Sequence, residues 1–407
     1  MEIYYYFLAF FLFIFILFFL FFIYIRIRFP FWALQPVFHV YDYQYLFCPK
    51  GIIQMELPEK NKYTNFENIE TLVLNEIQIP EYKLSTFIYF IQNHYVDKGK
   101  DKFFFPKKEN IIPYFKSHNQ KSFLSFYLKK ELIHDLKKDL VMDHTKCIGV
   151  MTSRPVHISI LQNKKFHLFD AYYVDYLCVH SNFRKQNIAP EIIQTHEYNQ
   201  RHENKKMVVS IFKREGELTG IIPLTVYNTY GFSVKKWTKP PELPSYYNLL
   251  EINAQNISYL HDFLKNQQSQ GLFDIFIQTE VSNIIELIKT NNIFIYCILF
   301  QDQIVCAYFF RKSCVFIEND LEILTCIGSI NTFKEESVFI HGFKSCFWRI
   351  AFQHHFGFAA IENISHNYLV INNLIKKTIP NVISPTAYFF YNFAYSTFPS
   401  KKTFILL

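Results

Sequence analysis

Residues 174–190 read VDYLCVHSNFRKQNIAP, and this stretch decides the fold that we expect around it. Its first part closes a long apolar run over 166–180, which is typical of a buried strand. A polar loop with Arg184 and Lys185 follows, and Pro190 suits the first turn of a helix. Free N–H groups at a helix start, together with two basic side chains, favour a phosphate or pyrophosphate ligand. An ordinary solvated basic loop before a helix is the alternative that this stretch alone leaves open.

Strand and helix patterns alternate on both sides of this stretch. We expect further helices over 84–95, 121–140, 256–268, 280–289 and 339–355. We expect strands over 146–151, 155–161, 166–180, 206–212, 222–229, 294–300, 304–311, 316–329, 358–362 and 386–394. The order of elements is similar on either side of 236–246, where three prolines break the periodicity. The patterns predict an α/β fold, with an α+β mixed sheet, made of two similar halves.

The amino-terminal segment has the pattern of a membrane anchor. Residues 3–25 form an unbroken apolar and aromatic run, and at 1.5 Å per residue its length matches a bilayer core of roughly 30 Å. The run has no basic segment before it and no small-residue cleavage site, which argues against a removable signal peptide. Arg26 and Arg28 follow the run, whereas only Glu2 precedes it. By the positive-inside rule we expect a single-pass membrane protein whose remaining chain faces the cytoplasm.

The composition excludes several kinds of site. Ten glycines among 407 residues are about a third of the usual share of roughly 7%, and neither the dinucleotide-binding nor the P-loop glycine pattern occurs. The eight cysteines form no C-x-x-C pair, and His354-His355 has no acidic or Cys partner at metal spacing, so we expect no metal site. The net charge of +7 comes without a dense basic block, so nucleic acid is not an expected partner.

Four segments, in one order along the chain, resemble the N-myristoyltransferases (glycylpeptide N-tetradecanoyltransferases), which are built from two GNAT-type halves. The family pattern E-I-N-F-L-C-V-H-x-x-x-R-S-K-R-x-A-P is similar to 174–190. The pattern V-G-F-I-S-x-x-P-x-x-I-x-I is similar to IGVMTSRPVHISI at 148–160. The patterns F-W-x-T-Q-P-V and Y-Y-L-Y-N-W resemble FWALQPV at 31–37 and YFFYNF at 388–393.

This resemblance implies a duplicated GNAT-like acyltransferase fold preceded by one transmembrane helix. It implies an N-acyltransferase that moves a long acyl chain, myristoyl above all, from acyl-CoA to the amino-terminal glycine of proteins. We expect an anchor over 1–28, an acyl-CoA-binding half over 29–240, and a half over 241–407 that binds peptide and supplies the carboxyl terminus. Myristoyl-CoA or another long-chain acyl-CoA is then a co-substrate, no cofactor is bound permanently, and we expect a monomer.

The resemblance also implies which residues act on the acyl donor. Backbone amides of Tyr176 and Leu177 correspond to the family's oxyanion hole, and the free carboxylate of Leu407 corresponds to its base. Residues implied in acyl-CoA binding are Phe31, Trp32, Cys178, Val179, Arg184, Lys185, Gln186, Asn187, Ile188 and Ala189. Gln186 and Asn187 stand where the family has cations, so phosphate affinity is expected to be lower.

The segment expected to bind the acceptor peptide departs from the family in charge. The family pattern V-E-D-D-D-N-x-F-R-F is an acidic loop that helps to hold basic peptide residues, and this chain has VDKGKDKFFF at 96–105. We therefore expect neutral or acidic acceptor peptides. Peptide-binding residues carried over by position are Asp97, Phe103, Phe105 and Ser233.

Two other functions stay open on the sequence. The first is an acyltransferase retargeted to lysine, to another amine or to another acyl length. The second is a non-catalytic protein that holds acyl-CoA or an acylated peptide at a membrane. The changed phosphate loop favours the second alternative, whereas the retained oxyanion strand and carboxyl terminus favour the transferase.

Overall fold

A computed structural model describes residues 2–48, 50–74, 79–96, 102–135, 140–216, 220–317 and 321–407. Its helices are α1 (Glu2–Arg28), α2 (Tyr43–Phe47), α3 (Glu81–His94), α4 (Lys108–Ile111), α5 (Ile188–Glu203), α6 (Ile257–Ser269), α7 (Val281–Lys289), α8 (Glu336–His354) and α9 (Asn367–Ile375). Its 3-10 turns are η1 (Trp32–Leu34), η2 (Ile112–Phe115), η3 (Ser181–Phe183) and η4 (Ser400–Lys402).

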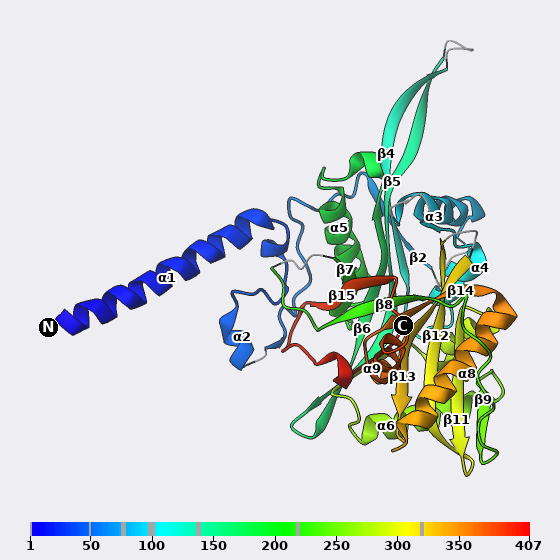
Figure 1. The fold of residues 1–407 in the computed structure, drawn as a ribbon. Helices are drawn as coiled ribbons and strands as arrows, with labels where there is room; N and C mark the ends of the chain where they lie inside the picture. Colours follow the sequence, from blue (N-terminus) through cyan, green and yellow to red (C-terminus); the bar gives the residue numbers. More distant parts are fainter. Residues whose placement is uncertain are drawn as a thin grey trace.

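The strands belong to one large mixed sheet and a small two-stranded one (Figure 1). They are β1 (Gly51–Ile52), β2 (Ile69–Val73), β3 (Lys102–Phe104), β4 (Phe123–Asp135), β5 (Leu140–Gln162), β6 (Lys165–Val179), β7 (Val209–Glu215), β8 (Thr225–Ser233), β9 (Tyr247–Glu251), β10 (Ile275–Gln278), β11 (Ile293–Phe300), β12 (Gln303–Ile317), β13 (Leu321–Asn331), β14 (Phe356–Glu362), β15 (Val382–Tyr391), β16 (Phe393–Ala394) and β17 (Thr403–Leu406).

The large sheet is built from two similar halves. In the first, β4, β5 and β6 form an antiparallel meander, and α5 then leads to β7, which is parallel to β6. In the second, β11, β12 and β13 repeat the meander, and α8 leads to β14, parallel to β13. The last strand of each half pairs with the other half: β8, which follows β7, pairs with β14, and β15, which follows β14, pairs with β7. The expected mixed α/β fold with two similar halves is therefore confirmed.

The expected helix over 121–140 is wrong. Residues 123–135 form β4, which pairs along its length with β5, so the described part of this segment is one arm of a long antiparallel pair. The side chains of residues 123–127 are all buried. A short buried run of this kind occurs in both strands and helices, so the sequence pattern alone does not distinguish them. Pairing with β5 decides between the two. The two strands expected at 146–151 and 155–161 are parts of the single strand β5.

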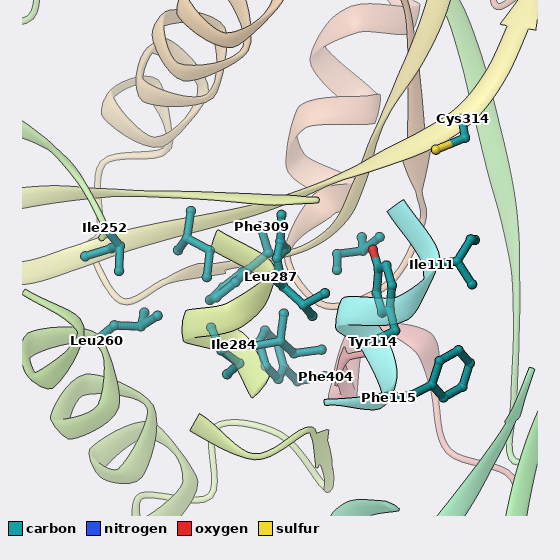
Figure 2. Packing of buried hydrophobic residues seen from close by; sticks show 14 of the residues in the cluster. Ile111, Tyr114, Phe115, Ile252, Leu260, Ile284, Leu287, Phe309, Cys314 and Phe404 are labelled. Carbon is teal, nitrogen blue, oxygen red and sulfur yellow. The ribbon is translucent and has the colours of Figure 1, made fainter. Parts of the chain in front are cut away.

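The main hydrophobic core joins both halves and reaches the carboxyl terminus. Tyr114 of η2, Leu287 of α7 and Phe404 of β17 belong to one cluster of buried side chains (Figure 2). Phe87 of α3 belongs to the same cluster. Strand β17 lies parallel to β10, which in turn pairs with β5 at residues 157–160. The last residues of the chain are thereby held inside the fold rather than at a frayed end.

Helix α1 projects away from the sheet body (Figure 1). Residues 4–28 are long and apolar enough to cross a membrane, and most of their side chains are exposed. The end of α1 contacts the body where Ile25 is buried. A Cβ on Gly220 would lie 2.6 Å from Ile25 Cγ2, so a glycine is needed for this approach.

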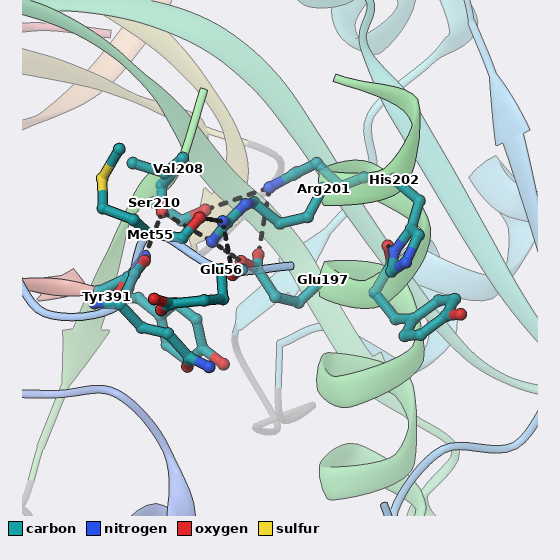
Figure 3. Close-up of polar contacts among 12 residues, drawn as sticks. Met55, Glu56, Glu197, Arg201, His202, Val208, Ser210 and Tyr391 are labelled. Atoms are coloured by element: carbon teal, nitrogen blue, oxygen red, sulfur yellow. Dashed lines mark hydrogen bonds and ion pairs between the residues drawn. The ribbon is translucent and has the colours of Figure 1, made fainter. Parts of the chain in front are cut away.

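A buried ion-pair network fastens the segment that follows the anchor region to α5 (Figure 3). Arg201 Nη2 donates to the carbonyl oxygens of Met55 and Glu56 at 3.1 and 3.0 Å, and Nη1 lies 3.9 Å from Glu197 Oε1. Burial raises the pKa of Glu197 to about 7, although Arg201 opposes this shift. Helix α5 is in this way held at its far end while its first turn faces the candidate site.

Candidate functional site

Strands β6 and β7 separate near the middle of the sheet. They pair only from Ala171–Val209 to Val174–Phe212, after which β6 continues to Val179 along β5 and β7 continues along β15. The backbone groups of β6 beyond Val174 thus lack β7 as a partner on that side. Such a splayed pair leaves backbone donors available to a ligand that lies between the strands.

A β-bulge lies just past the point of separation. Asp175 pairs with Thr152 and Cys178 pairs with Val150, so two residues of β6, Tyr176 and Leu177, stand opposite one residue of β5. Tyr176 has φ of 48°, a left-handed conformation that costs energy in a bulky residue. A bulge of this kind re-aims backbone groups and is common beside active sites.

The Tyr176 amide already has a partner. Its N–H donates to Asp175 Oδ1 at 3.0 Å, and its ring packs against Phe87, Tyr95 and Phe115. Burial and the charge of Asp175 raise the pKa of the Tyr176 phenol well above its usual range, so the phenol stays neutral at physiological pH. Leu177 is 36% exposed. An oxyanion at this bulge would therefore have to displace the Asp175 carboxylate from one of the two amides.

The loop after β6 has a backbone shape suited to an anion. Lys185 and Asn187 adopt left-handed conformations, with φ of 65° and 62°, on either side of Gln186, and all three are exposed. Helix α5 begins directly afterwards at Ile188, so Pro190 lies in its first turn, as expected. Alternating backbone conformations ahead of a helix turn N–H groups toward one side, where an anion binds.

Arg184 holds this loop in place. Its Nε donates to Val179 O at 3.4 Å and its Nη2 donates to His94 O, at the end of α3, at 3.0 Å. Its guanidinium thus ties the loop to the neighbouring helix, whereas Lys185 offers the exposed charge. Cys178 is buried and Val179, Ala189 and Pro190 are partly buried.

Helix α5 lies unusually close to β5. A Cβ on Gly149 would be 2.4 Å from Ile192 Cδ1 and 3.4 Å from Ile188 Cγ2, so glycine permits this packing. Ile188 and Ile192 are both buried there. This contact sets the position of the first turn of α5 relative to the bulged strand.

Phe31 and Trp32 lie at the point where β6 and β7 separate. The Trp32 ring stacks on Phe212, the last β7 residue paired with β6, with centroids 5.5 Å apart. Phe31 is buried against Tyr63 and Trp32. His39 Nε2 lies 2.9 Å from Trp32 O, which fixes the turn η1. The structure therefore brings Trp32 to Phe212, 180 positions later in the sequence, at the last residue of β7 that pairs with β6.

The carboxyl terminus is buried beside a cluster of charged and phenolic side chains. Leu407 is 2% exposed, and Arg311 Nη1 donates to Leu407 O at 3.5 Å. Burial raises the pKa of the Tyr114 and Tyr173 phenols; the charge of Arg311, beside the carboxyl terminus, opposes this rise, whereas that of Asp175, at the bulge, adds to it. These two phenols therefore lie within electrostatic range of both the terminus and the bulged strand. Burial raises the pKa of Tyr114 to about 12, against the opposing charges of Arg311 and Arg154.

Glu362 is the buried acid of this cluster. It accepts from Lys213 Nζ at 2.8 Å and from the Tyr227 hydroxyl at 2.5 Å. Burial favours its neutral form, but Lys213 and Arg311 outweigh burial and leave its pKa below the usual range. Sequence reasoning missed Arg154, Arg311, Glu362 and Lys213. A basic residue inside a run otherwise typical of a buried strand was the signal that could have found the two arginines.

The residues expected to bind peptide lie around the second half of the sheet. Phe103 stacks on Phe316 of β12 with centroids 5.2 Å apart, and Phe105 is 52% exposed and donates its N–H to Cys314 O. Ser233 ends β8, and its N–H donates to Asn381 Oδ1 at 2.9 Å. Asp97 lies outside the described residues. Among the described residues, no group of three His, Cys, Asp or Glu side chains could hold a metal.

Part of the chain matches one protein-family model. Residues 56–224 match the family model described as "Myristoyl-CoA:protein N-myristoyltransferase, N-terminal domain". A search of curated protein sequences finds no match.

Solved structures share the fold over almost the whole chain. A crystal structure of Saccharomyces cerevisiae N-myristoyltransferase with bound myristoyl-CoA has 15% sequence identity and a TM-score of 0.66, and the match covers 91% of this chain and 94% of that one. A second yeast structure with bound myristoyl-CoA has 14% identity and a TM-score of 0.68, with 91% and 89% covered. At this identity the likeness establishes the fold.

Proposed function

We propose that the chain is an N-myristoyltransferase, because residues 56–224 match the model of that family's N-terminal domain. It would transfer a long acyl chain from acyl-CoA to the amino-terminal glycine of proteins. The acyl donor is myristoyl-CoA, and the acceptor amine attacks the thioester directly. The observation that carries the proposal is the buried carboxyl terminus, because Leu407 is 2% exposed and lies beside the cluster that reaches the bulged strand. The domain limits that we propose remain 1–28, 29–240 and 241–407.

Acyl-CoA would lie between the separated strands β6 and β7. Its phosphates would meet Lys185, Gln186, Asn187 and the first turn of α5, at Ile188 and Ala189. Phe31 and Trp32 would cover the CoA portion of the donor from the other side, since Trp32 stacks on Phe212 at the point where β6 and β7 separate. Gly149 supports this arrangement because it permits α5 to approach β5.

The chemistry needs a base and an oxyanion site. The Leu407 carboxylate accepts a proton from the glycine ammonium, and the free amine then attacks the thioester carbonyl carbon. Negative charge that develops on the carbonyl oxygen is met by the amides of Tyr176 and Leu177. The C–S bond then breaks and CoA leaves as the thiolate, which takes the second proton of the attacking nitrogen, so that a neutral amide bond remains on the glycine. Phe103, Phe105, Ser233 and Asp97 are the proposed peptide contacts.

Helix α1 is the proposed membrane anchor. Its length and composition suit a single crossing, and Arg26 and Arg28 at its carboxyl end favour a body that faces the cytoplasm. A monomeric enzyme held at a membrane in this way would release its acylated product beside a bilayer.

One observation favours a non-catalytic alternative. The Tyr176 amide donates to Asp175 Oδ1, and Gln186 and Asn187 replace two cations of the phosphate loop. A protein that binds acyl-CoA or an acylated peptide without turnover would retain the same fold.

The test uses the full chain in detergent micelles with myristoyl-CoA and a library of peptides that begin with glycine. Thiol release and mass spectrometry of the products measure turnover. The matched control is a chain with one glycine added after Leu407, which moves the terminal carboxylate while leaving the rest of the fold in place. Turnover by the natural chain and its loss in the extended chain support the proposal. Equal turnover by both chains, or acyl-CoA binding without product, contradicts it.

A further inference from the structure

Arg154 is a buried cation that the proposed reaction does not use. Its side chain is 0% exposed, and Nε, Nη1 and Nη2 all lack a hydrogen-bond partner in the described part of the chain. Its guanidinium carbon lies 5.2 Å from the centroid of the Tyr114 ring and 5.1 Å from that of Tyr173. Ring faces attract a cation but provide no acceptor for its five N–H groups.

The acids of the buried cluster around Tyr173 and the carboxyl terminus have other partners. Glu362 accepts from Lys213 and Tyr227, Asp175 accepts from the Tyr176 amide, and Leu407 O accepts from Arg311. His118, whose Nε2 lies 2.9 Å from Tyr114 O, also has a buried Nδ1 without a partner. The structure thus leaves one guanidinium and one imidazole nitrogen unsatisfied in the same neighbourhood.

An unpaired buried charge is costly, and sites that retain one commonly do so for a ligand. The planar fork of an arginine matches a carboxylate or phosphate with two parallel hydrogen bonds. A ligand that supplies such an anion would remove the cost. Arg154 therefore has the chemistry of a binding subsite rather than of a structural support.

The position of Arg154 indicates which substrate carries the anion. Arg154 pairs with Tyr173, three residues before the bulge at Tyr176, which corresponds to about 10 Å along β6. The loop at Lys185 lies beyond the carboxyl end of β6, past the bulge and roughly 20 Å or more from Tyr173. The CoA phosphates therefore cannot reach Arg154 while they occupy that loop. An extended acceptor advances about 3.3 Å per residue, so its first few residues span the 10 Å.

We infer that Arg154 is a subsite for an acidic side chain of the acceptor, located within the first four or five residues after the glycine. This inference rests on the proposed function, which places the acceptor glycine at the bulge and the following residues toward Tyr173. The rings of Tyr114 and Tyr173 flank the guanidinium, and the acceptor carboxylate would displace the Tyr114 ring to form a bidentate ion pair.

The test compares octapeptides that begin with glycine and carry Asp or Asn at each of positions 2 to 5. Acylation by the full chain in detergent micelles gives kcat/KM for each Asp–Asn pair. We expect at least a tenfold preference for Asp at one position in the natural chain. In Arg154→Met this preference falls below twofold, while kcat/KM for the Asn peptides stays within twofold. Arg154→Lys, which keeps the charge but not the fork, retains part of the preference.

Two further readouts separate the inference from its alternatives. The thermal unfolding midpoint of Arg154→Met should equal or exceed that of the natural chain, because an unpaired buried charge is removed; a clear fall would indicate a structural role and overturn the inference. Equilibrium binding of labelled Asp and Asn peptides to the acyl-CoA-loaded chain needs no turnover. Binding that prefers Asp through Arg154 without product would refute only the transferase. Turnover of all peptides without charge preference would refute only the Arg154 subsite, and neither binding preference nor turnover would refute both.

Discussion

The contact between Gly149 and Ile192 allows a quantitative test of how α5 is positioned. A Cβ added at Gly149 would lie 2.4 Å from Ile192 Cδ1, far below any normal carbon contact, while its next neighbours, Cys178 O and Ile188 Cγ2, lie at 3.4 Å. Ile192 is 0% exposed, so its terminal methyl has little space into which to move. We expect overpacking in Gly149→Ala to cost about 1–3 kcal/mol. The reduced entropy of the unfolded chain returns roughly 0.4–1 kcal/mol of this.

Ile192→Val removes the atom that clashes. Alone it should cost about 0.5–1.5 kcal/mol, because it deletes one buried methyl group. Combined with Gly149→Ala, the new Cβ occupies the space that Cδ1 has left, so the double variant should be more stable than the sum of the single costs predicts. We expect a favourable coupling free energy of about 1 kcal/mol or more.

Equilibrium denaturant unfolding of the full chain in detergent micelles measures the four free energies of this cycle. The Michaelis constant for acyl-CoA provides the functional readout, since a displaced first turn of α5 should raise it in Gly149→Ala and the double variant should recover it. If the losses in the free energy of unfolding of the two single variants add to that of the double variant within about 0.5 kcal/mol, the contact between Gly149 and Ile192 does not set the position of α5. An unchanged Michaelis constant in a destabilised Gly149→Ala chain would show that its first turn does not bind the donor.

The remaining predictions concern charge, acid stability and the buried ion pair. Gln186→Lys should lower the Michaelis constant for acyl-CoA by roughly fivefold, or about 1 kcal/mol, in a salt-dependent manner, whereas Asn187→Lys should gain less because Asn187 has φ of 62°. Burial lowers the pKa of His366 to about 4, so the unfolded chain binds more protons between pH 6.5 and 4 and the free energy of unfolding falls as the pH drops through that range. His366→Asn keeps the acceptor for the Asn331 N–H, and it should reduce this acid loss by at most about 3 kcal/mol in pH-dependent unfolding measurements. Arg201→Met should cost about 3–5 kcal/mol and expose the chain near Met55 to proteolysis, while Glu197→Gln should cost less because the pKa of Glu197 is already about 7. Equal losses for these two variants would contradict this account of the pair.

Local patterns determined a large part of this protein. The order of apolar strand, basic loop and helix at 166–203 follows from side-chain period and from Pro190, and the apolar run at 3–25 determined a long helix, because these features depend on neighbours in sequence. Ordered motifs at 31–37, 148–160, 174–190 and 388–393 were enough to identify the fold family. The segment at 123–135 shows the limit, since its apolar start suits either element and only its pairing with β5 makes it a strand.

Tertiary structure alone decided what surrounds the site. Trp32 reaches Phe212, and the short strand β10, which no local pattern predicted, receives β17 and so buries Leu407. Arg154 and Arg311 lie 157 positions apart in sequence, yet the charges of both oppose the rise that burial causes in the pKa of Tyr114 and Tyr173. Neither arginine has a pattern that marks it as buried, because burial and the lack of a partner depend on contacts made by distant strands. The sequence predicts a donor loop and a terminal carboxylate, whereas the buried, unpaired guanidinium of Arg154 could be found only in the folded chain.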